Sequence, residues 1–298
     1  MKKNLILAFF LLTTPGIACI NEFHTLINGQ VVESEGLVGI HVRDLNHEVL
    51  KRELSELRRK YNATPSFEVK SDIGAILIYL GRYDEAIALY REIEQVQPGI
   101  YAVASNMGTA FELTGQNDSA LHYIKKAIKI DPKSHRSSEW IHVKILEAKI
   151  RFRNNPDSLQ YFNILGLDFG VERKPNNVNA LNLEELEKQI RFQLSERMAF
   201  VKPKDVIVGQ ILFELGNVTA LTHDVQTALA AYALAHDYGF ESDLMSSRNL
   251  LFRVLAFKAT VMDNMLLIVA SIVLIIAISI FIWLMIRLFR RIRSNRIR

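Results

Sequence analysis

The chain has 298 residues and a formal net charge of +4, with 36 basic and 32 acidic side chains. Eight of the basic residues stand at its two ends, namely Lys2, Lys3, Arg287, Arg290, Arg291, Arg293, Arg296 and Arg298. The rest of the sequence is therefore slightly acidic, which removes the main support for a nucleic-acid-binding protein. We expect no nucleic-acid partner, and the basic ends instead indicate a membrane orientation.

Residues 1–18 have the pattern of a signal peptide. Two lysines precede an apolar stretch from Leu5 to Leu12, which is too short to span a bilayer and is typical of a bacterial export signal. Cleavage after Ala18 would leave Cys19 first in the mature chain, either unmodified after an ordinary signal peptidase or lipid-modified. Cys19 is the only cysteine, so an intramolecular disulfide is excluded.

Residues 19–64 are expected to form an N-terminal segment that caps the following fold. An amphipathic pattern from Asp44 to Tyr61 predicts one helix in this segment. Such a helix suits the end of a helical array, where a terminal unit needs a polar outer face.

Residues 65–152 contain a repeat with a period of 34 residues. The matching pairs are Ile73 and Met107, Gly74 and Gly108, Leu77 and Phe111, Gly81 and Gly115, Ala86 and Ala120, Tyr90 and Ile124, Ile93 and Ala127, and Pro98 and Pro132. A fixed period of this length is typical of stacked helical hairpins.

Glycines stand where each hairpin needs them. Gly74 and Gly108 lack a side chain where the first helix approaches the second, and Gly81 and Gly115 fall at the end of each first helix, where a left-handed residue is easiest for glycine. The stretches GAILIYLGRYDEAIALY and GTAFELTGQNDSALHYIKKAIKIDP resemble the tetratricopeptide repeat. This resemblance implies an all-α solenoid that binds a protein or peptide partner.

The array is interrupted after the first helix of a third unit. Asn154-Asn155-Pro156 breaks it, so residues 153–204 are expected to form an irregular insert and a helix. Within the insert, residues 160–174 suggest a loop or a short strand. Asn182 is expected to cap a helix from Leu183 to about Phe200.

A diverged hairpin is expected at residues 205–240, followed by a linking helix at residues 241–264. Gly216, Ala228, Tyr232 and Ala235 keep the intervals seen in the first repeat. We therefore interpret residues 205–240 as a diverged third tetratricopeptide hairpin.

Residues 265–286 predict a transmembrane helix. These 22 positions carry no charge, and at about 1.5 Å per residue they reach roughly 33 Å, enough for a hydrocarbon core of about 30 Å. Three basic residues lie within twenty positions before the span and six arginines after it. Residues 287–298 are therefore expected to be a cytoplasmic tail, with the repeats on the extracytoplasmic side of the inner membrane.

The resemblance also implies a concave groove lined by the first helix of each hairpin. Its inward positions include Asp72, Tyr79, Asn106, Thr109, Trp140, Val143 and Glu147. A clamp for a terminal carboxylate, known in some members of the family, needs asparagines at equivalent places, and the presence of Asp72 and Trp140 there speaks against it. Trp140 is the strongest candidate for a partner contact, the alternative being packing against residues 160–174.

Motifs for catalysis or metal binding are missing. The sequence has no HExxH, GxSxG or Walker loop, and Asp168-Phe169-Gly170 spells a kinase triplet without the other kinase motifs. We expect no catalytic residue, no metal and no cofactor. An enzyme would need acids converging in the groove, where Asp72 and Glu147 stand two units apart.

These patterns predict a non-enzymatic, membrane-anchored scaffold or adaptor with a protein or peptide partner in its groove. The alternative is an accessory or sensory subunit of an envelope complex, in which residues 160–200 respond to a ligand.

Overall fold

The computed structural model describes residues 33–35, 38–43 and 46–295. The described chain is almost entirely helical, which confirms the predicted all-α fold of stacked hairpins. One small addition is an antiparallel pair of strands, β1 (Glu33–Glu35) and β2 (His41–Arg43), in which Ser34 pairs with Val42. The predicted signal peptide of residues 1–18 and Cys19 lie outside the described residues.

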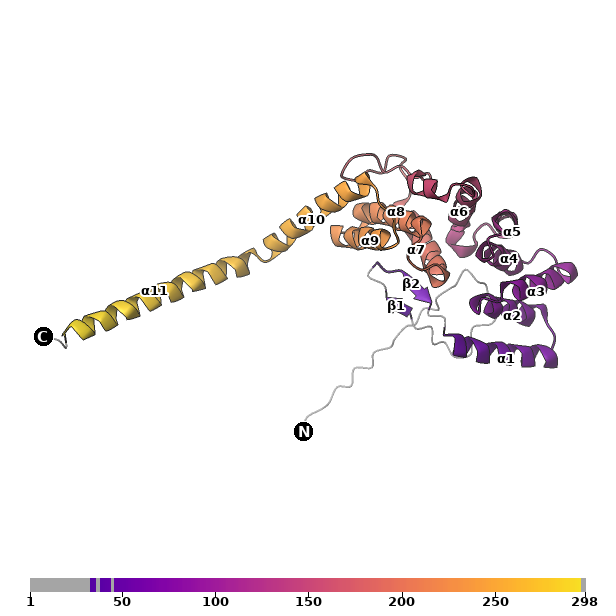
Figure 1. Cartoon of the computed structure of the whole chain (residues 1–298), viewed down its shortest axis with the longest axis horizontal. Coiled ribbons are helices and arrows are strands. Elements are labelled where there is room, and N and C mark those ends of the chain that lie inside the picture. Colours follow the sequence, from indigo (N-terminus) through magenta and orange to yellow (C-terminus); the bar gives the residue numbers. More distant parts are fainter. Residues whose placement is uncertain (1–32, 36–37, 44–45, 296–298) are drawn as a thin grey trace, which may run out of the picture.

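The first half of the fold is a curved row of helices (Figure 1). Its elements are α1 (His47–Ala63), α2 (Phe67–Tyr79), α3 (Tyr83–Val96), α4 (Tyr101–Leu113), α5 (Asn117–Ile130), the 3₁₀ helix η1 (Ser134–Ser137) and α6 (Glu139–Arg151). The expected N-terminal helix is α1, which starts later than its pattern suggested because the Asn46 side chain accepts hydrogen bonds from the amides of Glu48 and Val49.

Glycine lets the two helices of each hairpin pack closely, as the sequence predicts. A Cβ on Gly74 would lie 2.5 Å from the ring of Tyr90, and one on Gly108 would lie 2.5 Å from Ile124 Cδ1. The third hairpin repeats this contact, because a Cβ on Gly216 would lie 2.3 Å from the ring of Tyr232. The diverged hairpin therefore shares with the first repeat a close contact between a glycine of its first helix and a tyrosine ring of its second.

The second half begins with the insert and continues as helices. Its elements are the 3₁₀ helix η2 (Pro156–Tyr161), α7 (Leu183–Phe200), α8 (Val206–Thr222) and α9 (Val225–Asp237). Residues 162–182 form a loop, so of the two alternatives for residues 160–174 the structure shows no strand there. Asn182 caps α7 as predicted, its side chain accepting a hydrogen bond from the amide of Glu185.

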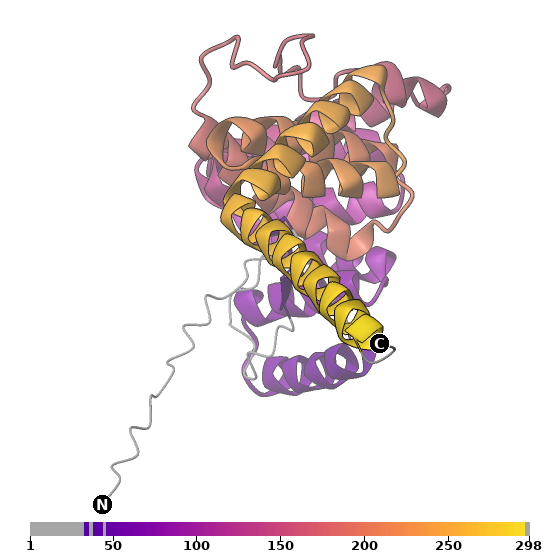
Figure 2. The same cartoon turned by 90° about the vertical axis from the view of Figure 1, so that its left-hand side faces the viewer.

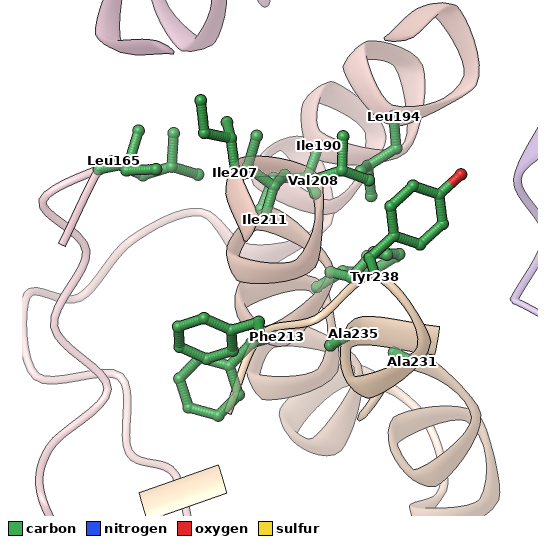
Figure 3. Close-up of a cluster of buried hydrophobic side chains, with 14 of the residues drawn as sticks. Leu165, Ile190, Leu194, Ile207, Val208, Ile211, Phe213, Ala231, Ala235 and Tyr238 are labelled. Carbon is green, nitrogen blue, oxygen red and sulfur yellow. The ribbon is translucent and has the colours of Figure 1, made fainter. Parts of the chain in front are cut away.

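Two hydrophobic clusters hold the fold together. One joins α1 to α5, with Leu146 of α6, and the other joins α6 to the rest of the chain up to Phe252. Figure 3 shows part of the second cluster, where Ile190 and Leu194 of α7 lie beside Val208 of α8 and Leu165 of the insert faces Ile207.

The chain ends in two long helices, α10 (Asp243–Asp263) and α11 (Met265–Asn295). α10 packs along α9 and carries the predicted linking segment, whereas α11 extends away from the other helices in Figure 1 and points toward the viewer in Figure 2. Within α11, residues Met265–Arg287 are long and apolar enough to cross a membrane, and they are unburied in the structure.

Among the described glycines, Gly209 comes closest to a backbone atom of a neighbouring segment, so a methyl group added there should destabilise the folded protein strongly. A Cβ on Gly209 would lie 2.7 Å from Phe240 Cβ and 2.9 Å from the carbonyl oxygen of Ala235, which cannot move without shifting the α9–α10 connection. We expect Gly209→Ala to lower the free energy of unfolding by about 2–3 kcal/mol. Urea unfolding of the full chain in detergent, followed by circular dichroism, measures it.

Gly81→Ala is the control. Gly81 has φ +76° and no atom within 4 Å of its would-be Cβ, so only the backbone is strained. We expect this variant to cost about 1 kcal/mol. A Gly209→Ala protein as stable as Gly81→Ala would refute the close packing of α8 against the α9–α10 connection.

Candidate partner-binding surface

α7 covers the face that the sequence assigned to a partner. Among the described residues, Asp72 and Asn106 are buried inside the first cluster, and Thr109 is buried as well. Tyr79 is also buried, and its ring stacks on the ring of Phe200 of α7 with centroids 5.8 Å apart. All four positions are thus buried in this structure: α7 lies over Tyr79 and beside Thr109, whereas Asn106 donates a hydrogen bond to the Tyr90 hydroxyl of α3. Their role in partner binding stays a prediction.

The three remaining inward positions lie further along the row, on α6. The Trp140 indole donates a hydrogen bond of 2.8 Å to Gln189 of α7, so it contacts α7, which neither of its two predicted roles included. Val143 is half-buried against the first cluster. Glu147 is half-exposed and forms an ion pair with Lys125 of α5 at 2.9 Å. Trp140, Val143 and Glu147 thus all keep partial exposure.

A buried ionic cluster joins α7 to α4 and α6. Glu112 of α4 accepts from His142 Nε2, Lys149 Nζ and Arg197 Nη1, each at 2.6 Å. Lys149 and His142 come from α6 and Arg197 from α7, so one carboxylate connects three helices. Burial of such a group is tolerated only because all its charge is compensated.

A second carboxylate extends this cluster along α6. Glu139 Oε1 lies 2.7 Å from His135 Nδ1 and accepts from the Tyr101 hydroxyl at 3.0 Å. Its other oxygen lies 3.5 Å from Nδ1 of His142, which therefore stands between two carboxylates. The result is a continuous buried network of acids, histidines and cations under α7.

The network shifts the pKa values of its members. Burial would raise the pKa of Glu112, but Arg197, Lys149 and His142 hold it well below its usual range. Burial alone would likewise raise the pKa of Glu139. Hydrogen bonds from His135 and His142 outweigh this effect, so the pKa of Glu139 is lowered. Burial lowers the pKa of His142, yet its contacts with Glu112 and Glu139 raise it overall.

This network has little room for a ligand. The cavity beside Glu112 and Arg197 has a volume of about 60 Å³, enough for a few water molecules but too small for a peptide. No group of three or more potential metal ligands occurs in the described part of the chain. The network is therefore suited to holding α7 in place.

A larger cavity lies between the insert, α8 and the start of α10. It has a volume of about 520 Å³, and its lining includes Phe169, Phe213 and Phe240. Two buried charged residues also line it, Glu214 of α8 and Arg248 of α10. Sequence reasoning missed this site, because its residues come from three distant segments and form no local motif.

Arg248 is bound almost completely by the protein. Its Nε donates to the Glu172 carbonyl, Nη1 to Asn217 Oδ1, and Nη2 to the carbonyls of Phe169 and Gly170. The guanidinium therefore fixes the insert loop against α8. The triplet Asp168-Phe169-Gly170, which spells a kinase motif, is part of this anchor.

Glu214 is buried with little compensation. Its only hydrogen-bond partner among the described residues is Asn217, whose Nδ2 donates to Oε2 at 3.0 Å. Burial raises the pKa of Glu214 to about 7, against opposing effects from Asn217 and Arg248. A buried carboxylate of this kind is a frequent mark of a functional site.

The raised pKa of His142 predicts that α7 docking weakens as pH rises. Because the histidine gains protons on folding, its stabilising effect is complete below its ordinary pKa of 6.5 and disappears as pH passes the raised value. We expect the wild type to lose more unfolding free energy between pH 6 and pH 9 than His142→Gln does. Urea unfolding of the full chain in detergent at several pH values measures this.

Comparing the wild type with His142→Gln cancels the contribution of every other titrating group to the pH dependence of stability. Glu214, whose pKa is raised to about 7, also makes stability fall with rising pH, but it contributes equally to wild type and variant. If the unfolding free energies of the two proteins depend on pH in the same way, His142 is neutral in the ionic cluster.

Comparison with known families identifies the first half of the fold. The family model of the tetratricopeptide repeat matches residues 67–99 and 102–134, which contain the hairpins α2–α3 and α4–α5. The match ends at residue 134, so it does not include the α8–α9 hairpin, whose relation to the repeat stays a prediction. Neither the curated proteins nor the solved structures compared with the chain include a significant match. Residues 67–99 and 102–134 thus each match the tetratricopeptide repeat, a module that generally mediates protein–protein interaction.

Proposed function

We propose that this protein is a non-enzymatic adaptor for protein–protein interaction, anchored in a bacterial inner membrane by α11 with its repeats on the extracytoplasmic side. The two tetratricopeptide repeats support the interaction role. The apolar surface of α11 supports the anchor, and it is the observation that carries the proposal.

α11 exposes more apolar surface than a protein in water sustains. Its window of highest hydropathy, with a mean of 3.2, is unburied. Leu266 and Phe281 are 83% and 64% exposed, and the apolar surface begins before the span, with Phe257 and Met262 of α10 also exposed. Contiguous apolar surface of this extent indicates a membrane environment or a protein partner, and the length of the helix favours the membrane.

The distribution of charge supports the proposed orientation. Arg248, counted on the N-terminal side of the span, is buried and bound to loop carbonyls. Only Arg253 and Lys258 then remain near the membrane on that side, against six arginines after the span. The asymmetry favours a cytoplasmic tail.

The inward residues keep a proposed role in an opened form of the protein. α7 turns its apolar side, with Ile190 and Leu194, toward α8, whereas its polar side, with Gln189 and Arg197, meets the groove. Polar interfaces within a chain separate more readily than apolar ones. We propose that α7 moves with α8 when a partner enters the groove.

A second candidate function is a sensory subunit whose insert responds to a ligand. The cavity of about 520 Å³ favours it, because the insert loop forms one of its walls and Arg248 holds that loop. An adaptor with a ligand-dependent insert would combine both functions.

Topology can be measured with reporter fusions. Alkaline phosphatase is active only outside the cytosol, and we expect activity when it is fused just ahead of Met265 and none when it follows the arginine tail. A fluorescent protein that matures only in the cytosol should give the opposite pattern. Phosphatase activity at the tail alone would reverse the orientation.

Partner capture tests the groove. We expect Trp140→Ala to reduce several-fold the amount of the main protein crosslinked in intact cells, because the indole lies on the inner side of α6. Circular dichroism should show unchanged helicity. As a control, Val96→Ala shortens an apolar side chain that is 87% exposed at the end of α3. Equal capture by the wild type and Trp140→Ala would rule out this face.

A further inference from the structure

The large cavity has the size and walls of a site for a small molecule. Its volume of about 520 Å³ falls within the usual range of ligand pockets, about 300–1,000 Å³. Phe169, Phe213 and Phe240 provide aromatic surface, and all three are buried. These rings can bind an apolar chain or, through their faces, a cation.

The charges around the cavity are mainly negative. Four carboxylates line it, from Asp168, Glu214, Glu241 and Asp243, against one cation, Arg248. The guanidinium already donates hydrogen bonds to three carbonyls and to Asn217. An anionic ligand would therefore meet acids and find little donor capacity, so the cavity selects against anions.

Glu214 gives this negative cavity a specific centre. Glu214 lines the cavity and is only 6% exposed. Among the described residues it has no ion-pair partner, and it accepts one hydrogen bond, from Asn217. A buried carboxylate without a counter-ion destabilises the folded protein unless a ligand or a proton neutralises it. The cavity thus places a carboxylate that has no direct ion-pair partner, and that Arg248 compensates only from a distance, beside aromatic walls.

We propose that this cavity binds a small organic cation, a primary amine or a guanidinium group, with Glu214 as its counter-ion. The cation would replace the missing partner of the carboxylate, and the aromatic rings would cover its hydrocarbon part. The group can belong to a free amine or to a lysine or arginine side chain of a peptide. The inference is independent of which protein the repeats bind.

Protons should compete with the cation for the Glu214 carboxylate. Burial raises the pKa of Glu214 to about 7, so below that pH a proton occupies the site that the cation needs. The other groups facing Glu214 are Asn217 on its own helix, Tyr232 from α9, Arg248 from α10 and Asp168 from the insert. Affinity for a permanently charged amine is therefore expected to rise between pH 6 and pH 8.

Calorimetric titration of the full chain in detergent tests the proposal. Cadaverine and agmatine are the free amines, and acetyl-glycyl-lysyl-glycinamide is the peptide probe. The neutral 1,5-pentanediol and the anionic glutarate match cadaverine in length and should not bind. Binding of the free amines supports a solute site, and binding of the peptide alone supports side-chain recognition, while binding of neither overturns the proposal.

Glu214→Gln keeps the shape of the side chain and removes its charge. We expect it to weaken amine binding about tenfold or more, as for loss of a charged hydrogen-bond partner, and to abolish the gain in affinity from pH 6 to pH 8. Glu56→Gln, on the exposed surface of the distant helix α1, is the control and should bind normally. Unchanged amine binding by Glu214→Gln would overturn the proposal.

Folding of the variant is checked independently. At pH 8 Glu214→Gln should melt at the same temperature as the wild type or higher, because it removes a buried charge without a counter-ion. Should the variant unfold, Asp243→Asn at the exposed rim replaces it, with an expected two- to threefold loss of amine affinity. No loss with this rim variant would then count against the proposal.

Discussion

The arrangement of the whole fold depends on the contact between Glu112 and Arg197. This pair lies 85 residues apart in sequence and connects α4, a helix of the second tetratricopeptide repeat, to α7. Removing two charges from water is costly, so such a pair contributes more to the choice of one geometry than to total stability. Here it selects the position of α7, and through α7 the position of α8 to α11.

α7 can have this role because its two sides are different. The apolar side merges with the second hydrophobic cluster, which makes α7 and α8 one packed unit, and the polar side meets the groove through Gln189, Gln193 and Arg197. Two halves with separate cores thus meet across a largely polar seam. Their relative position is fixed by ionic contacts, which respond to pH, and not by apolar packing alone.

Features with a local cause could be predicted from the sequence, and features that join distant segments could not. The caps of α7 and the glycines at the hairpin crossings have signals within a few residues, and they formed as expected. The covering of Tyr79 by Phe200 and the cavity around Glu214 depend on segments up to 121 residues apart, for which one sequence gives no pairing information. Arg248 illustrates the limit, since it was counted as a membrane-side charge although it serves as the anchor of the insert.

The cavity and the proposed membrane span are connected by a single helix, α10. Arg248 in the first turns of α10 holds the insert loop over the cavity, and α10 continues to Asp263, where α11 begins two residues later. α10 is the only described connection between the repeats and the apolar part of α11, so a movement of α10 relative to α8 changes the direction in which α11 leaves the fold. In the proposed membrane-anchored arrangement, the packing of α10 around the cavity therefore sets how the repeats are placed relative to the membrane.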